Sequence, residues 1–416
     1  YLDLSARNDW ASTLALTGNQ SYLYPSIGLS AIVSQMVKLP EFISYFKLRA
    51  SLTQTANEVP FNVVDPQNSI GSGGTINRNT QVPFTNLQPE KIVANEYGTD
   101  IRFLKGRFGV NFTVYKDVST NQFLTLSAPS GSGYTFYYVN AGKIVNNGFE
   151  FTVDADVVRN TNLIWKTAFN GSTNKNKIVE LIKDNPKYVV GGQDEGFDSR
   201  IMADGSFNDL WIYKFARNDA GQIILDPNTA KPTKATNEVK VGNVNPDFLL
   251  GWNNDFTYKN FFASVLVDSK FGGVAFSKTE AFLDSYGVSE RTATARDKGS
   301  IPINAIMGTT AVTSIDPYTY YSTVGDRNSI MEPYVFSRTN VRLAQFVLGY
   351  TFRSQKANPV FKDASVSLIG RNLFFFYKKA PFDPEQAMST SNSMQSNDVF
   401  SMPSTRSFGF NVKLTF

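Results

Sequence analysis

The residue types that most often carry out catalysis are missing from this sequence. Its 416 residues include no His and no Cys. The commonest general base, the commonest metal ligand and the thiolate nucleophile are therefore absent. A hydrolase built from this chain would have to rely on Asp or Lys. We predict no catalytic residue, no cofactor-binding residue and no metal site, and hence no enzymatic activity.

One pair of acids, Asp154 and Asp156, could in principle bind an ion or act as acid and base. The two lie in a segment in which polar and apolar residues alternate, so both belong to one face of a strand. If that face borders a hydrated channel, its carboxylates need no special partner. We interpret the pair as solvated acids of a channel wall.

Aromatic clusters in otherwise polar segments are better candidates for binding. Aromatic rings stack on sugar rings and on peptide side chains at little entropic cost. Contact with a ligand, contact with a partner protein and simple packing all remain open for them. The candidate contacts are Tyr137, Tyr138, Trp211, Tyr213, Tyr320 and Tyr321, which lie near Tyr134, Phe136 and Tyr318.

Strict alternation of apolar and polar residues marks the elements that would position these clusters. The clearest example is the end of the chain, where Phe408, Phe410, Val412, Leu414 and Phe416 alternate with polar residues or Gly. The same period of two recurs from Phe108, Phe149 and Phe346. Such a period predicts strands with one apolar face. We expect these four segments to be neighbouring wall strands with the Phe side chains facing lipid.

The connections between the predicted strands alternate between short and long. Tight turns are expected at Lys105-Gly106, Arg159-Asn160-Thr161 and Lys259-Asn260. The long connections are expected at about 57–90, 117–146, 173–244, 272–339 and 372–403. Short turns on one side and long loops on the other are typical of transmembrane barrels, and unusual in a soluble domain.

Composition agrees with many strands and argues against other classes. Aromatic residues make up 14% and charged residues 18% of the chain, and we count roughly 12 to 14 strands of about 10 residues. No run approaches the roughly 18 apolar residues of a membrane-spanning helix. The net charge is only +4, with Lys and Arg dispersed, so nucleic acid is not an expected partner.

Ordered motifs along almost the whole chain resemble the SusC/RagA family of TonB-dependent outer-membrane proteins of Bacteroidetes. The most specific runs from Val139 to Glu150 and reads VNAGKIVNNGFE. One departure is Ala56 before Asn57, where the family usually has Gly. The other motifs are LSARND from Leu4, YPSIG from Tyr24, FKLRAS from Phe46, LQPE from Leu87, EYG from Glu96, NPDF from Asn245, RNLF from Arg371, PFDPE from Pro381 and PSTRSFG from Pro403.

The resemblance implies an all-β fold and a set of partners. Residues 1–416 would be the carboxyl-terminal part of an antiparallel barrel of about 22 strands, in the bacterial outer membrane and surrounded by its lipid. A signal peptide, a TonB box and a plug are expected before Tyr1. A SusD-like surface lipoprotein would cover the extracellular mouth, and the TonB-ExbB-ExbD complex would supply energy. On its own, the chain is not expected to close into a barrel.

The expected function is active import of a bulky nutrient, an oligosaccharide rather than a peptide. A passive porin or a structural barrel is the alternative, because it would share the same strand pattern. The motifs themselves are interpreted as structural, with Gly142 and Gly148 allowing a bend where a loop re-enters the wall. We expect residues 173–244 and 272–339 to face the cell exterior and contact the lid or the substrate.

Overall fold

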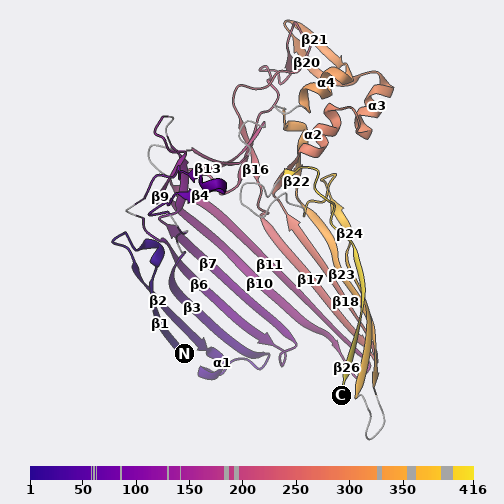
Figure 1. Ribbon diagram of the computed structural model, residues 1–416. Coiled ribbons are helices and arrows are strands. Elements are labelled where there is room, and N and C mark those ends of the chain that lie inside the picture. Colours follow the sequence, from indigo (N-terminus) through magenta and orange to yellow (C-terminus); the bar gives the residue numbers. More distant parts are fainter. Residues whose placement is uncertain are drawn as a thin grey trace. The chain divides into compact units, whose positions relative to one another are not determined.

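A computed structural model of the chain contains one large antiparallel sheet with smaller folded parts in its long connections (Figure 1). The structure describes residues 1–416 except 58, 60, 62, 85–86, 129–130, 141, 182–186, 192–195, 326–329, 354–361 and 386–396. Twelve strands follow one another in the large sheet, in the order β1-β2-β3-β6-β7-β10-β11-β17-β18-β23-β24-β26. The chain falls into two compact units, residues 1–156, 168–186 and 202–205 against 157–167, 187–201 and 206–416.

The first unit consists mainly of long paired strands. Its wall strands are β1 (Leu2–Trp10), β2 (Ser21–Ile32), β3 (Ile43–Asn57), β6 (Glu90–Phe103), β7 (Phe108–Thr120), β10 (Lys143–Arg159) and most of β11 (Leu163–Glu180). Its connections hold η1 (Ser12–Leu14), α1 (Val33–Met36), β4 (Ser69–Ile70), η2 (Ser72–Gly74), β5 (Ile76–Asn77), β8 (Phe123–Ser127) and β9 (Phe136–Asn140). A small core under these connections contains Leu14, Val63 and Leu87.

The two faces of this unit differ in polarity as the alternation predicts. Val114 of β7 lies level with Tyr97 of β6 and Phe149 of β10, and the next residue along each strand points to the other face. On that other face Thr113, Gly98 and Glu150 lie level. One face is therefore apolar and the other polar, as a wall between lipid and water requires.

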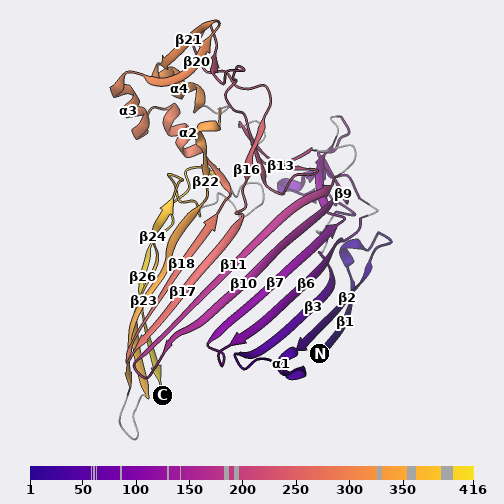
Figure 2. The same cartoon turned by 180° about the vertical axis from the view of Figure 1, so that it is seen from behind.

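The second unit carries the remaining wall strands and a folded insertion (Figure 2). Its wall strands are β17 (Phe248–Tyr258), β18 (Phe261–Phe271), β23 (Asn340–Arg353), β24 (Asp363–Lys378) and β26 (Ser407–Thr415). The other strands are β12 (Lys187–Gly191), β13 (Phe197–Met202), β14 (Asp209–Ile212), β15 (Ile223–Leu225), β16 (Val239–Asn243), β19 (Val274–Ser277), β20 (Ile301–Met307), β21 (Thr310–Ile315), β22 (Val335–Ser337) and β25 (Asn397–Asp398). The helices are α2 (Lys278–Ser285), α3 (Glu290–Lys298), α4 (Pro317–Val324) and the short η3 (Glu332–Tyr334).

Segments from different connections share one hydrophobic core in this unit. Phe197, Leu210, Phe276 and Met331 are buried together in it, and the rings of Phe197 and Phe276 lie 3.9 Å apart. Arg217 holds both carboxylate oxygens of Glu332 at 2.9 Å. We call the part built from residues 196–244 and 272–339 the loop domain.

The predicted strand count, tight turns and long connections are confirmed. Turns separate β6 from β7, β10 from β11 and β17 from β18 at the expected residues. Two details were wrong. The strands are longer than expected, up to 18 residues in β11, and the longest connections are folded because their apolar residues form a core.

The expectation that the four Phe segments are neighbours was wrong, and the orientation of their Phe side chains toward lipid stays a prediction. β7 and β10 pair directly, whereas β24 lies between β23 and β26. Phe108 and Phe149 share the apolar face of the first unit. None of the helices in the described ranges is both long and apolar enough to cross a membrane.

Candidate functional site

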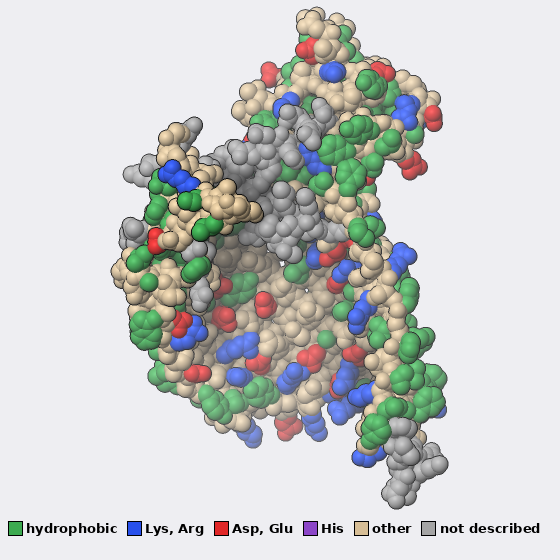
Figure 3. All heavy atoms as spheres, in the orientation of Figure 1, with side chains coloured by type: hydrophobic (Ala, Val, Ile, Leu, Met, Phe, Trp, Pro, Cys, Tyr) green, Lys and Arg blue, Asp and Glu red, His purple; other side chains and the backbone are tan. Residues whose placement is uncertain are grey.

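The polar face of the first unit is lined by paired charges. Arg49 of β3 donates to Asp100 of β6 at 2.8 Å, and Arg102 of β6 donates to Asp154 of β10 at 2.6 Å. The space-filling view shows acidic and basic side chains interspersed over strands of the sheet (Figure 3). The first pair joins the adjacent strands β3 and β6, and the second joins β6 to β10 across β7 on the wet face.

The pair Asp154 and Asp156 shows no acid–base arrangement. Asp154 is the partner of Arg102, and the backbone carbonyl of Asp156 accepts from the Arg107 guanidinium at 3.1 Å. Among the residues that the structure describes, no three acidic groups gather where a metal could bind.

Three short helices of the loop domain enclose a pocket of about 280 Å³. Each helix begins at a side chain that caps it: Ser277 accepts from the Glu280 N–H, Ser289 from the Thr292 N–H, and Asp316 from the Thr319 N–H. α3 ends at Gly299, whose φ of 78° is one that glycine adopts without strain. The caps explain why α2, α3 and α4 form at all despite their short length.

Asp284 holds the inner wall of this pocket together. Its side chain is only 1% exposed, and it accepts hydrogen bonds from Ser289 at 2.6 Å, Arg291 at 2.7 Å and the Tyr334 hydroxyl at 2.9 Å. Burial and the neighbouring Asp284 raise the pKa of Tyr334 well above its usual range. The network fixes α2 against α3 and η3.

The rim of the pocket presents aromatic and hydrogen-bonding groups to solvent. Tyr286 is 78% exposed and Tyr318 is 76% exposed, and both line the pocket with Tyr321, Thr292 and Arg296. Arg296 donates to the Gly287 carbonyl at 2.7 Å, which holds its guanidinium beside the opening. Flat aromatic faces beside fixed polar donors are suited to a ring that bears hydroxyl groups.

The structure places Tyr320 and Tyr321 in different surroundings. Tyr320 packs against the loop-domain core, 6.2 Å from the Phe215 ring, and burial raises its pKa to about 12. Tyr321 also touches that core but lines the pocket. Of this predicted pair, only Tyr321 lines the pocket, and its contact with a ligand remains a prediction.

Trp211 and Tyr213 lie along β14 and just beyond it. The Arg200 guanidinium lies over the Trp211 ring at 5.0 Å, and the Lys234 ammonium lies over the Tyr213 ring at 4.3 Å. Arg200 also forms an ion pair with Glu238. Both rings are partly buried against cations of their own chain, and their contact with a lid or substrate remains a prediction.

Tyr137 and Tyr138 belong to β9 in the first unit. Tyr138 stacks on Phe123 at 4.4 Å and lies edge-on to Phe136 at 5.5 Å, so its ring serves the small core of that unit. Tyr137 is the adjacent residue and points to the opposite face of the strand. Of the two, Tyr137 therefore stays the candidate for contact with a ligand or a partner protein.

Sequence reasoning missed most of the pocket. Tyr286, Arg296 and Asp284 had not been selected, because α2 and α3 had been expected to be loop. The available signals were Ser277 three residues before Glu280, Ser289 three residues before Thr292, and Gly299 after Lys298. These are start and stop patterns of helices.

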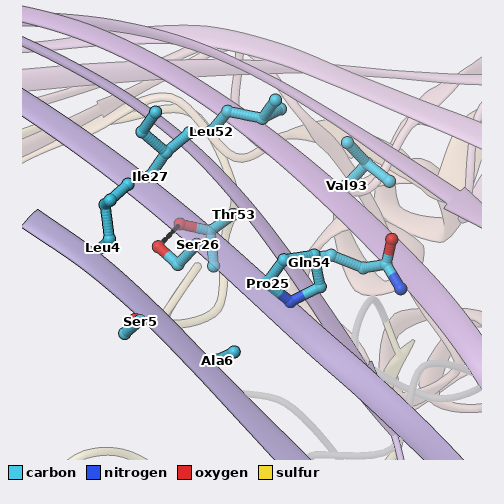
Figure 4. Close-up of a pocket in the computed structure, with 10 residues that line it drawn as sticks. All are labelled: Leu4, Ser5, Ala6, Pro25, Ser26, Ile27, Leu52, Thr53, Gln54 and Val93. Atoms are coloured by element: carbon cyan, nitrogen blue, oxygen red, sulfur yellow. Dashed lines mark hydrogen bonds between the residues drawn. The ribbon is translucent and has the colours of Figure 1, made fainter.

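A second hollow, of about 450 Å³, lies on the apolar side of the first unit. Leu4, Ile27, Leu52 and Val93 line it, and a 2.8 Å hydrogen bond joins Ser26 to Thr53 across β2 and β3 (Figure 4). Small side chains at Ala6 and Pro25 create the depression between larger ones. Its apolar lining suits hydrocarbon and offers little to orient a polar nutrient.

Comparison with known proteins agrees with this architecture. Residues 1–199 match the family described as TonB dependent receptor-like, beta-barrel. Over 99% of its length the chain is 24% identical to TonB-dependent receptor P3 of Formosa agariphila, of which it covers 43%. Over 72% of its length it is 21% identical to TonB-dependent receptor SusC of Bacteroides thetaiotaomicron, of which it covers 30%.

Solved structures show the same fold. The RagAB peptide importer in its closed-closed state superposes with a TM-score of 0.77 at 16% identity, over 100% of this chain and 46% of that one. Its open-open state gives a TM-score of 0.76 at 17% identity. The chain thus spans less than half the length of the relatives that it matches.

Proposed function

Because residues 1–199 match the TonB dependent receptor-like, beta-barrel family and the chain is similar to SusC and to the RagAB importer, we propose that it lies in the outer membrane and forms part of an active importer of a bulky nutrient. In this proposal residues 1–416 are the carboxyl-terminal part of the barrel wall and its long connections. The protein moves its substrate and breaks no bond.

The observation that carries this proposal is a pocket in one of the long connections of a chain that also forms a two-faced wall. The wall has an apolar face and a charged face, as a hydrated pathway through lipid requires. The pocket lies in the connection between β18 and β23, and in outer-membrane barrels the long connections face the exterior. It is therefore suited to catching a molecule before transport.

We propose an oligosaccharide as the substrate, with a peptide as the second candidate. The exposed rings of Tyr286 and Tyr318 offer stacking faces for sugar rings. Arg296 and Ser322 add guanidinium and hydroxyl groups around the same opening. The volume of about 280 Å³ suits one sugar unit of a longer chain.

The proposal includes partners outside this chain. A SusD-like surface lipoprotein would close over the long connections, and the TonB-ExbB-ExbD complex would supply the energy. The similarity to SusC and to the RagAB peptide importer supports this arrangement. Trp211, Tyr213 and Tyr137 are the side chains that we propose for contact with the lid or substrate.

The test is a binding titration on the complete transporter, with oligosaccharides and peptides as probes. The double variant Tyr286→Ala/Tyr318→Ala should weaken oligosaccharide binding at least tenfold, since each ring contributes about 1 to 3 kcal/mol. Phe61→Ala, which removes another exposed aromatic ring, should change it less than twofold. Unchanged oligosaccharide affinity in the double variant would contradict the assignment, and loss of peptide binding alone would favour the peptide.

Uptake experiments separate an importer from a porin. Cells that rely on this transporter should stop accumulating the oligosaccharide when a protonophore collapses the proton gradient. Uptake through a passive porin would continue until inside and outside concentrations were equal. Uptake of the oligosaccharide that is insensitive to the protonophore would therefore support the porin instead.

A further inference from the structure

A set of lysines lies on the apolar face of the first unit, at the end of the strands nearest the long connections. β7 pairs with β6 and β10 without any shift of register. Lys116 lies level with Asn95 and Asn147, and four residues further on Lys91 and Lys143 flank Thr120. All of them alternate in step with Val114, so they share its face.

A fourth lysine, Lys175 of β11, extends this set to the next strand. Asn174 and Asn176 both donate to the Asn146 side chain, at 3.3 Å and 2.9 Å. Asn146 alternates with Asn147 and so lies on the polar face. Lys175, between the two asparagines, therefore lies on the apolar face. We call Lys91, Lys116, Lys143 and Lys175 the lysine patch.

In the part of the chain that the structure describes, the four lysines of the patch form no ion pair, unlike several arginines of the wall. Arg49, Arg102 and Arg342 each form an ion pair with an Asp. On the face that carries the patch, the described residues of β6, β7 and β10 include no Asp or Glu. The acids of β6 and β7 at this end, Glu90, Glu96 and Asp117, lie on the polar face. Lys177, two residues beyond Lys175 on β11, is paired with Asp204 at 3.0 Å.

Position and charge together indicate what covers these side chains. The patch lies directly beyond the apolar row formed by Tyr97, Val114 and Phe149, where the hydrocarbon of the outer leaflet would give way to headgroups. Lysines at such a boundary extend their ammonium groups into the headgroup layer while their stems stay on apolar surface. Clusters of them attract anionic lipid.

We propose that the lysine patch binds the phosphate groups of a phosphorylated lipid in the outer leaflet of the outer membrane. Lys91 and Lys143 are two strands apart, about 10 Å, and Lys116 lies about 13 Å along the wall from them. This spacing suits a large headgroup with more than one phosphate. Val93, Val118 and Val145, which lie level between the two lysine rows, would contact its apolar part.

The test uses the complete transporter in detergent and a fluorescent, bisphosphorylated lipid A as probe. Lys91→Gln/Lys116→Gln/Lys175→Gln removes three exposed cations of the patch. The matched control is Lys38→Gln/Lys105→Gln/Lys259→Gln, which removes three exposed cations from the opposite end of the strands. Each lysine near a lipid headgroup changes the affinity about fivefold. The patch variant should therefore bind the lipid A probe at least tenfold more weakly than the unsubstituted transporter. The control should change less than twofold.

Two further probes identify the ligand. Dephosphorylated lipid A should bind the unsubstituted transporter weakly, with no difference between variants, and inorganic pyrophosphate should not compete at micromolar concentration. An equal loss of lipid A affinity in the two triple variants would overturn the proposal. So would binding of dephosphorylated lipid A as tight as that of the bisphosphorylated form. Competition by pyrophosphate would assign the patch to free phosphate. If the patch variant fails a heat-modifiability gel, the comparison of the two lipids on the unsubstituted protein decides.

Discussion

At the scale of single residues, neighbouring tyrosines of α4 lie in different surroundings. Tyr318 is exposed at the rim of the pocket, whereas Tyr320 is packed into the core of the loop domain. Their separation by two residues on a helix turns them to different sides. An aromatic cluster in a polar segment therefore indicates a candidate binding region, but it does not assign a role to each ring.

The buried position of Tyr320 predicts a pH effect. Its pKa is raised from 10.0 to about 12 in the folded domain, so the folded state holds the proton more tightly than the unfolded state. The resulting stabilisation is complete below pH 10 and is lost as the pH rises toward 12. In an absorbance titration at alkaline pH, Tyr320→Phe should remove one tyrosine ionisation, the one near pH 12. Tyr318→Phe should leave that ionisation in place, and its loss there would contradict the assignment.

Asp284 gives a prediction on stability. Replacing it with Ala leaves the buried Tyr334 hydroxyl without its acceptor and removes one of the two carboxylates that pair with Arg291, which should cost about 1 to 3 kcal/mol. Hydrogen exchange of α2, α3 and α4 in the complete protein should become faster, while the wall strands keep their protection. Asp297→Ala, at an exposed site in α3, is the control. Equal exchange in both variants would show that Asp284 does not hold the helices together.

At the scale of elements, the motif Asn146-Asn147-Gly148 has a role other than the one predicted. It was expected at a bend, but it lies inside β10. Gly148 does not need a positive φ. A β-carbon there would collide with the carbonyl oxygen of Thr173 and the ring of Tyr115, whose hydroxyl lies 3.4 Å from that oxygen. Gly142 alone, at a φ of 88°, serves the bend.

Gly148→Ala should therefore disturb the pairing of β10 with β11. The added methyl group overpacks the wall, for which about 1 to 3 kcal/mol is typical. A heat-modifiability gel of the complete transporter should show less folded protein at a given temperature. Gly409→Ala, where a β-carbon meets nothing within 4 Å, should behave like the unsubstituted protein. Similar behaviour of the two variants would refute this role.

At the scale of the whole molecule, the wall was predictable and the loop domain was not. Period-two patterns and turn residues are local, so the strands, their faces and the alternating connections followed from the sequence. The loop-domain core instead joins residues far apart, such as Phe197, Phe276 and Met331. No short pattern indicates such contacts. The pocket was missed for the same reason, since its residues on α2 and α3 meet those on α4 through contacts between separate helices.

The shared core also bears on how such a protein can change over evolutionary time. Residues 272–339 leave and re-enter the wall through β18 and β23, which pair with Lys270 opposite Asn340, so a short turn could replace them without altering the strands. Their removal alone would strip Leu210 and Ile212 of their apolar cover and release Arg217 from Glu332. The two connections that build the loop domain should therefore be inherited and exchanged together, as one unit. A new specificity would then arrive by replacing both together on an unchanged wall.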